Sequence, residues 1–464
     1  MATLRKSKAS NPPPQSRTWI VVFWQGACRA LIKIFYRRFE VTGQERIPHG
    51  VGIIFCANHA NALVDPIVIQ AATTQQIHPL ARSGLFEIPL LKTMLKMLDA
   101  VPIYRQQDPG NKTEKNVDSF VKCYEKLGED KTIMIFPEGV SHSDPTMRKV
   151  NTGAARIALG AKKLNGKPPV LVPVGLTFSH KGFFRGDLLV QFGEPVVVGD
   201  KEDIDDRGSV KAITERVKQG IIKITLNPNS WEELKLITRV ERFYAQRHGR
   251  DENLDLSEQF EALNYIIKAQ RMLLEHKPER VKALINHLRL YDKLCQCCSI
   301  KDYHLSIKYQ PGVIFMYILR TLFKILITLP VSLWGRLNNF LPYQLTNKVF
   351  LFFAKSLDQY DTYMILAGMV LFPLFWAIQI AFVSYFLGSN WAMTYFASLA
   401  ISTVVELQMR GKYLHVLEDF KTFFLFLRKS RIRDYLKSKQ NELETELDNL
   451  EKTADELLAE QKQA

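Results

Sequence analysis

The chain of 464 residues lacks the cysteine patterns of two common protein classes. Its six cysteines are scattered and do not form the disulfide framework of a small secreted protein. The local group at residues 295–298, Cys-Gln-Cys-Cys, lacks the paired spacing of a zinc site. We therefore expect reduced thiols, with reversible lipidation of this group as an alternative. Internal repeats are also missing outside the C-terminal tail.

Negative charge is scarce, with 47 acidic residues against 62 lysines and arginines and a net charge of +15. Such an excess suggests an anionic partner, which could be nucleic acid, a membrane surface or a phosphorylated substrate. The basic residues stand beside apolar segments and no nucleic-acid recognition motif occurs, so the charge favours membrane lipid and no nucleic acid is expected as a partner.

Composition divides the first two thirds of the chain into four parts. Residues 1–17 are polar, basic and interrupted by prolines, which predicts a disordered tail. Residues 18–39 mix aromatic and basic side chains, and their uncharged part is too short to span a bilayer. We expect an interfacial membrane helix there, or else a packed core helix. Strand-like and helix-like segments alternate through residues 40–200 and predict an α/β core, whereas charged helical periodicity through 201–305 predicts a helical extension.

Residues 306–410 are expected to form a membrane region. The strongest transmembrane candidate is Met364–Leu387, which is apolar for more than twenty residues apart from one glutamine. Trp391–Val405 provides a shorter return helix, so a transmembrane hairpin is the simplest interpretation. An earlier apolar stretch, Val313–Trp334, is long enough to span a membrane, but Arg320 and Lys324 on one helical face weaken that prediction, and an interfacial or re-entrant segment is the alternative. Basic residues flank the hairpin on one side, which predicts that this side is cytoplasmic.

Residues 411–464 are predicted to form a basic amphipathic helix followed by a short coiled coil. Leucines recur every seven residues in this tail and define an apolar stripe. The stripe suits a homodimer through residues 436–461, a helix that docks elsewhere, or a free amphipathic tail. Its leucines are Leu436, Leu443, Leu450 and Leu457.

The stretch Val51–Pro66 carries the first candidate chemistry. It starts as a short apolar run typical of a strand buried on both faces, and His59 follows that strand with Asp65 six positions later. A neutral imidazole can remove a proton from a hydroxyl, and a carboxylate can hold its tautomer. The stretch contains no protein nucleophile, so the hydroxyl would come from a substrate. The alternative is a satisfied structural His–Asp pair.

Two further strand ends present matching chemistry. One apolar strand ends at Arg105, whose guanidinium could bind phosphate in a bidentate manner. Another ends in Pro137-Glu138-Gly139, where an acid could orient a hydroxyl and glycine lets backbone N–H groups approach a ligand.

Together these residues resemble the glycerolipid acyltransferase family, which includes enzymes that form lysophosphatidate and phosphatidate. The first motif of that family, Asn-His followed by a spaced Asp, is matched by Asn58-His59 and Asp65, and the second by the strand that ends in Arg105. The third, Phe-Pro-Glu-Gly, is matched in full by residues 136–139, and the fourth by residues 172–175. The four motifs stand in family order between Asn58 and Gly175, and the resemblance covers residues 40–200.

Two departures from the common family motifs indicate which branch of the family this sequence resembles. Five residues separate His59 from Asp65 where the common family form has four, and Val140-Ser141 replaces the frequent Thr-Arg. These features look more like the fungal-type glycerol-3-phosphate and dihydroxyacetone-phosphate acyltransferases and their bacterial relatives. The missing motif-three arginine leaves Arg105 as first choice for the phosphate, with Arg148 and Lys149 as weaker candidates. The resemblance implies that His59 and Asp65 are catalytic and that the acceptor is bound by Asn58, Arg105, Pro137, Glu138, Gly139 and Arg148.

The resemblance implies a mixed sheet flanked by helices and a membrane-bound O-acyltransferase of phospholipid biosynthesis. An acyl-CoA or acyl carrier protein thioester would donate the acyl group to glycerol-3-phosphate or dihydroxyacetone phosphate, without a metal or redox cofactor. Acylation of 1-acylglycerol-3-phosphate or another lysophospholipid is the close alternative, and a catalytically idle membrane scaffold is the distant one. We expect an integral membrane protein with its active site on the cytoplasmic face, in a bacterial inner membrane or the endoplasmic reticulum.

Overall fold

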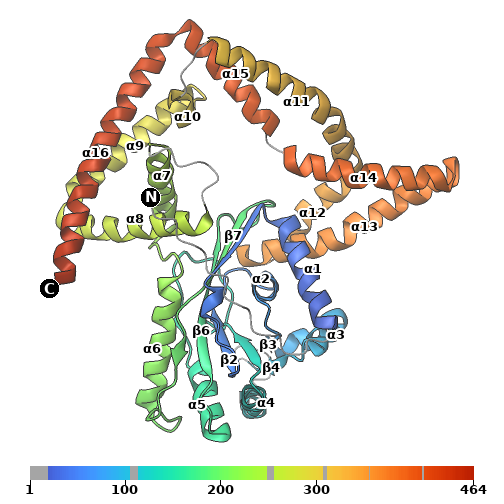
Figure 1. Cartoon of the computed structure of the whole chain (residues 1–464), viewed down its shortest axis with the longest axis vertical. Coiled ribbons are helices and arrows are strands. Elements are labelled where there is room, and N and C mark those ends of the chain that lie inside the picture. The colour runs from blue at the N-terminus through green and yellow to red at the C-terminus, as the bar shows by residue number, and fades with distance from the viewer. Residues whose placement is uncertain are drawn as a thin grey trace, which may run out of the picture. The chain divides into compact units, whose positions relative to one another are not determined.

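The computed structural model describes residues 19–104, 113–247, 255–306, 311–354, 356–409 and 412–463. The chain forms two compact units. The first contains residues 1–227 together with 356–362, and the second contains residues 228–355 together with 363–464. Figure 1 colours the chain by residue number. The short segment Ser356–Thr362, which we call the return segment, thus belongs to the unit that holds the N-terminal half of the chain.

The described residues of the first unit form one mixed sheet of eight strands, which confirms the predicted fold class. The strand order is β1-β7-β6-β2-β5-β3-β4, and β8 pairs with β6. The pairs in the order β6-β2-β5-β3-β4 are parallel, as is β1 with β7, whereas β7 and β8 run antiparallel to β6. The strands are β1 (Arg38–Thr42), β2 (Ile53–Ala57), β3 (Ile77–Arg82), β4 (Val101–Ile103), β5 (Thr132–Ile135), β6 (Val170–Phe178), β7 (Asp187–Phe192) and β8 (Val196–Val197).

Helices cover both faces of this sheet, and Figure 1 shows α5 and α6 on one side of the strands with α1 and α2 on the other. All five residues of β2 are buried, as expected of a central parallel strand covered on both faces. Ile54 and Cys56 join the apolar core against α4, α5 and α6. The helices of the first unit are α1 (Trp19–Phe35), α2 (Val64–Ala72), α3 (Pro89–Met97), α4 (Asn116–Gly128), α5 (Gly153–Asn165) and α6 (Arg207–Lys223), with 3₁₀ turns η1 (Gln44–Arg46), η2 (Ser83–Glu87) and η3 (Thr113–Lys115).

The first unit extends beyond the predicted end of the α/β core at residue 200. The reason is α6, whose buried residues Ile213, Val217 and Ile221 pack into the same apolar core as β2 and α5. A charged amphipathic helix of this kind has one apolar stripe, and the sequence pattern does not say which neighbour the stripe will cover.

The glycine in the fourth motif has a packing reason. A Cβ added at Gly175 in β6 would lie 2.1 Å from the backbone oxygen of Ile224, which follows α6. We expect Gly175→Ala to destabilise the protein by about 1–3 kcal/mol, since relieving this overlap requires backbone movement. Thermal unfolding of the purified protein measures it. Gly26→Ala is the matched control, because nothing lies within 4 Å of a Cβ at that position. Equal melting temperatures for Gly175→Ala and the wild type would contradict this close packing.

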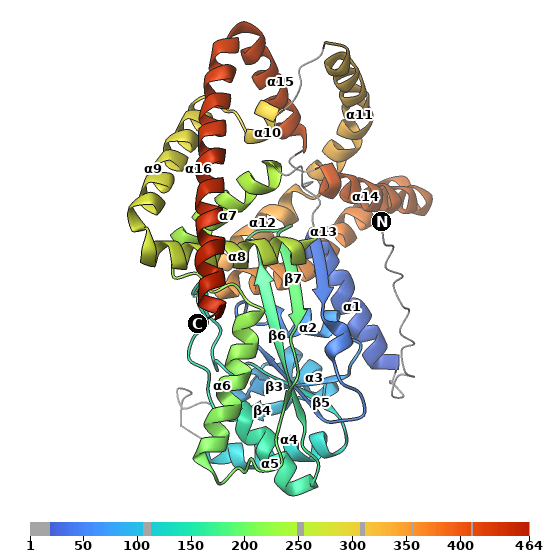
Figure 2. The same cartoon turned by 60° about the vertical axis from the view of Figure 1, so that its left-hand side comes forward.

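The second unit is helical, and its C-terminal helix docks within the chain. Figure 2 shows α16 beside α8 and α9, and these helices share one apolar core. Leu436, Leu443 and Leu450 are buried in that core, so of the alternatives for the leucine stripe the structure contains the docking helix. A homodimer through 436–461 stays a prediction. The helices are α7 (Trp231–Arg247), α8 (Leu256–His276), α9 (Pro278–Cys297), α10 (Asp302–Ser306), α11 (Pro311–Asn338), α12 (Phe340–Phe353), α14 (Ser389–Met409), α15 (Lys412–Arg428) and α16 (Ser430–Gln463).

Two helices among the described residues are long and apolar enough to cross a membrane, over Met316–Asn338 and Leu357–Leu387. The second includes the 3₁₀ turn η4 (Leu357–Gln359) and α13 (Tyr360–Leu387), which contains the strongest sequence candidate. The predicted return helix 391–405 lies in α14, which does not meet the same test and packs along α11. Met316–Asn338 meets it although it contains Arg320 and Lys324, because most of that stretch is apolar.

Candidate active site

His59 and Asp65 form a direct pair at the carboxyl end of β2. The Nδ1 atom of His59 lies 2.9 Å from Asp65 Oδ2, and the Asp65 side chain is fully buried. The same carboxylate oxygen accepts the backbone N–H of Asn61 at 2.7 Å. A carboxylate facing Nδ1 places the ring proton there and leaves Nε2 as the atom able to take a proton. The His59 side chain is 18% exposed, so a substrate can reach it.

Local structure sets this geometry. The loop after β2 ends where α2 begins at Val64, so Asp65 lies in the first turn of that helix. Ala62 has a φ of 37°, in the left-handed region, which bends the loop back on itself. The five residues between His59 and Asp65 are thus accommodated by one strained position. The His59 ring also stacks on Phe136 with ring centroids 4.1 Å apart, which limits its rotation.

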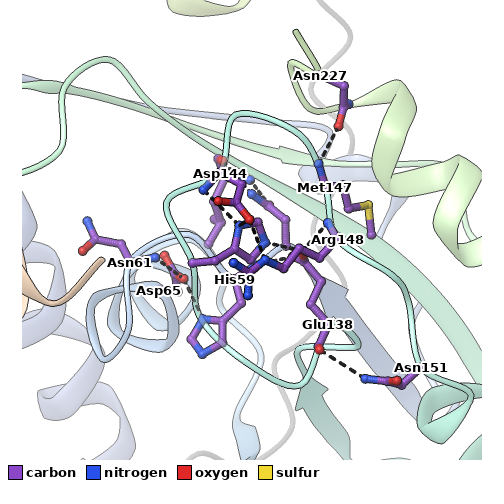
Figure 3. Close-up of polar contacts among 12 residues, drawn as sticks. His59, Asn61, Asp65, Glu138, Asp144, Met147, Arg148, Asn151 and Asn227 are labelled. Carbon is purple, nitrogen blue, oxygen red and sulfur yellow. Dashed lines mark hydrogen bonds and ion pairs between the residues drawn. The ribbon is translucent and has the colours of Figure 1, made fainter. Parts of the chain in front are cut away.

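Glu138 holds the backbone of His59. Its Oε1 accepts the His59 N–H at 2.9 Å, and its Oε2 accepts the Arg148 N–H at 2.9 Å and a hydrogen bond from His142 Nε2. The backbone N–H of His142 donates to the backbone carbonyl of His59 at 3.1 Å. Figure 3 shows Glu138 and Arg148 beside His59. Both polar backbone groups of His59 are therefore fixed by the loop that follows β5.

Glu138 is ionised in this setting. Burial acts to raise the pKa of its carboxyl, but the hydrogen bonds from His142, His59 and Arg148 outweigh burial and lower it below the ordinary value. A depressed folded-state pKa contributes stability that is present above the unfolded pKa and lost as the pH falls through the folded value.

The variant Glu138→Ala tests the hydrogen bonds that Glu138 accepts from the loops around His59. In Glu138→Ala the two backbone N–H groups of His59 and Arg148 lose their acceptor, which we expect to cost about 1–3 kcal/mol of stability for each donor left unsatisfied. The difference in melting temperature from the wild type should be full at neutral pH and shrink once the pH falls below the ordinary carboxyl range. The exposed Glu125→Ala on α4 is the control. A difference that does not change with pH would contradict an ionised Glu138.

The other predicted binding residues have varied surroundings. Asn58 bridges β2 to β6, because its side chain donates to the Leu176 carbonyl at 3.1 Å and accepts the Leu176 N–H at 2.7 Å. Pro137 is buried, and the turn continues through Gly139, whose φ of 78° is the left-handed value that glycine adopts without strain. The Arg148 guanidinium pairs with Asp144 at 2.5 Å and is about half exposed. Arg105 lies outside the described residues.

Four residues near the pair were not singled out from the sequence. Asn61 lies between His59 and Asp65, and His142 follows the third motif. Asp361 in the return segment and Lys181 after β6 complete the group. Burial lowers the pKa of Lys181, while the carboxylates of Asp65, Asp358, Asp361 and Glu138 act to raise it. A sequence signal existed for Asp361, because it is one of two aspartates just before the strongest apolar stretch.

The arrangement can carry out general base chemistry on a hydroxyl. Nε2 of His59 is the free imidazole nitrogen, Asp65 compensates the charge that the ring acquires, and the protein offers no nucleophile in this contact network. A hydroxyl on which such a base acts would belong to a bound molecule.

Comparison with known proteins gives the following similarities. Residues 38–177 match the model of a family described as acyltransferase. The chain is 29% identical over 134 residues to glycerol-3-phosphate O-acyltransferase 2 of Saccharomyces cerevisiae, which covers 28% of this chain and 18% of that protein. It is 28% identical over 186 residues to 1-acyl-sn-glycerol-3-phosphate acyltransferase of Bacillus subtilis, covering 39% of this chain and 85% of that protein. The chain thus spans less than a fifth of the length of the yeast relative.

A solved structure is also similar. The 1-acyl-sn-glycerophosphate acyltransferase of Thermotoga maritima shares 22% identity with a TM-score of 0.33, covering 44% of this chain and 79% of that one.

Proposed function

Residues 38–177 of the chain form an acyltransferase-family domain, and on this premise we propose that the protein is a membrane-bound glycerolipid O-acyltransferase. The observation that carries the proposal is the contact of His59 Nδ1 with the buried carboxylate of Asp65, with Nε2 left free. The names of the yeast and bacterial relatives describe acyl transfer to glycerol-3-phosphate and to 1-acyl-glycerol-3-phosphate. Both acceptors have the free hydroxyl that such a base requires.

The proposed step is a direct transfer. His59 Nε2 removes the proton of the acceptor hydroxyl while its oxygen attacks the carbonyl carbon of an acyl thioester. The tetrahedral intermediate collapses, the C–S bond breaks and the ester forms. The imidazolium then returns its proton to the departing thiolate, so the enzyme ends in its starting state. Asp65 stabilises the imidazolium through Nδ1, and Glu138 keeps the His59 backbone in place.

We assign the first acylation step, with glycerol-3-phosphate or dihydroxyacetone phosphate as the acceptor. The support comes from the longer His59–Asp65 spacing, the Val140-Ser141 sequence and the similarity to the yeast enzymes. The phosphate of the acceptor is assigned to Arg105, with Arg148 as the second choice. Acylation of a lysophospholipid is the alternative, favoured by the bacterial and plant relatives.

The proposal places the reaction at a membrane surface. Helix α1 exposes Trp19 and Phe23 while burying Cys28 and Ile32, so its apolar outer face suits the bilayer interface. The two apolar helices over 316–338 and 357–387 supply candidate membrane anchors. We assign the active site to the cytoplasmic face, where an acyl-CoA or acyl carrier protein donor is found.

The test offers the purified, detergent-solubilised protein a radiolabelled long-chain acyl-CoA with each of three acceptors in turn. The acceptors are glycerol-3-phosphate, dihydroxyacetone phosphate and lysophosphatidate. Product from either of the first two supports the assigned step. Product only from lysophosphatidate keeps the mechanism and replaces the acceptor. Silence with all three, repeated with an acyl carrier protein donor, would favour the idle membrane scaffold.

A further inference from the structure

The return segment Ser356–Thr362 puts an aspartate beside the catalytic loop from more than a hundred residues beyond the sheet. Asp361 lies at the start of α13 and is fully buried in the first unit. A buried carboxylate is costly unless hydrogen bonds compensate its lost hydration. The partners of Asp361 therefore indicate what keeps it there.

Asp361 accepts three hydrogen bonds from three separate parts of the first unit. Its Oδ2 accepts from the Asn61 side-chain amide at 2.5 Å and from the Tyr36 hydroxyl at 3.3 Å. Its Oδ1 accepts the Gly182 N–H at 2.8 Å, in the loop between β6 and β7. The carboxylate thus joins the end of α1, the loop after β2 and the loop after β6 at one point.

Asn61 connects this point to the catalytic pair. Its side-chain amide is held by Asp361, and its backbone N–H donates to the Asp65 oxygen that also receives His59 Nδ1. Figure 3 shows the Asn61 side chain directed away from His59. A shift of Asn61 would move the N–H that helps to hold Asp65, and with it the carboxylate that orients the imidazole.

A second aspartate of the return segment supports the same role. Asp358 is buried and accepts a hydrogen bond from the Ser141 hydroxyl. Ser141 precedes His142, whose N–H donates to the His59 carbonyl. The return segment therefore contacts both loops that hold His59. The return segment lies outside the family match, which ends at residue 177.

We propose that Asp361 is a positioning residue for the His59–Asp65 pair and acts through the side-chain amide of Asn61. The inference rests on the proposed acyl transfer. Since the contact is a hydrogen bond, a neutral polar group of the same size can replace the carboxylate. Asp361→Asn can keep the contact if the Asn61 amide turns over, because Asn61 Oδ1 has no hydrogen-bond partner in the described part of the chain and would then accept from the new amide.

The test compares kcat and KM for acyl transfer in five purified full-length proteins. These are the wild type, Asp361→Ala, Asp361→Asn, Asn61→Ala and the double variant Asn61→Ala/Asp361→Ala. Leu357→Ala is the matched control, because it removes a side chain of the same segment that is 54% exposed. We expect Asp361→Ala to lower kcat by about 10²-fold with KM within about threefold, the scale of a small misplacement of reacting groups. Asp361→Asn should retain kcat within about fivefold, and Leu357→Ala within about twofold.

The double variant separates positioning from a general structural role. If Asp361 acts through Asn61, the double variant loses no more kcat than the more affected single variant. If the fold-losses in kcat of the two single variants multiply in the double variant, the proposal is overturned. A wild-type kcat in Asp361→Ala would also overturn it, and so would a loss in Asp361→Asn as large as the loss in Asp361→Ala. Should Asp361→Ala not fold, Asn61→Ala must show the loss in kcat alone, and wild-type kcat there would overturn the proposal. An inactive wild type would instead refute the proposed function.

Discussion

Replacing His59 by alanine is expected to lower the kcat of acyl transfer by about 10²–10⁴-fold, the contribution of a positioned general base. The variant removes the only ring that contacts the buried Asp65 carboxylate among the described residues. The rate is measured with saturating labelled acyl-CoA and acceptor, so that kcat is separated from substrate binding.

The control for His59→Ala is His49→Ala, which removes an exposed imidazole from the loop after η1. This control should keep kcat within about twofold, as expected for a surface change. The melting temperature and the partition of His59→Ala into membranes should match the wild type. Full activity in a folded His59→Ala would refute His59 as the base, and equal losses in both variants would point to a general effect of losing a histidine.

Replacing Asp65 by asparagine is expected to lower kcat by about 10²–10⁴-fold, with KM changed much less. Two donors, His59 Nδ1 and the Asn61 N–H, converge on one carboxylate oxygen. If the new amide keeps its oxygen there, its NH₂ group replaces Oδ1, which is buried without a hydrogen-bond partner in the described chain. If the amide turns over, its NH₂ faces both donors and the ring adopts the wrong tautomer. In both cases the negative charge that stabilises the imidazolium is lost.

The exposed Asp118→Asn on α4 is the matched control for Asp65→Asn, since it makes the same chemical change away from the site. Thermal unfolding of both variants shows whether any loss of rate arises from unfolding. A folded Asp65→Asn that keeps its kcat would show that the contact with His59 is structural. That result would leave the base to act without a partner and would weaken the proposed mechanism.

Local pattern alone predicted much of the secondary structure. The predicted helical extension over 201–305 contains α7 (Trp231–Arg247) and α8 (Leu256–His276), because an apolar stripe with period 3.6 is a property of neighbouring residues. The strands β2 and β5 were also predicted from local pattern, as short apolar runs that end at candidate site residues. The contact of His59 with Asp65 also followed from the sequence, since both residues belong to one loop and the helix that follows it.

The roles of the third-motif residues needed the tertiary structure. The sequence placed Glu138 at a strand end and predicted substrate binding there, and the structure uses both carboxylate oxygens for hydrogen bonds within the protein. Strand order decides this, because β2 and β5 are neighbours although about 80 residues separate them. Which strands pair is set by the packing of the whole sheet and leaves no mark on either strand alone.

A histidine and an aspartate one loop apart, at the end of a strand with the pattern of a buried one, can be recognised from the sequence alone. Their surroundings depend on the tertiary structure. Asp361 is 300 residues from Asn61, yet the two form a hydrogen bond in the first unit. Periodicity reports the environment of residues close in the chain, whereas a contact over such a distance depends on the path of everything between. That is why the return segment was not predicted.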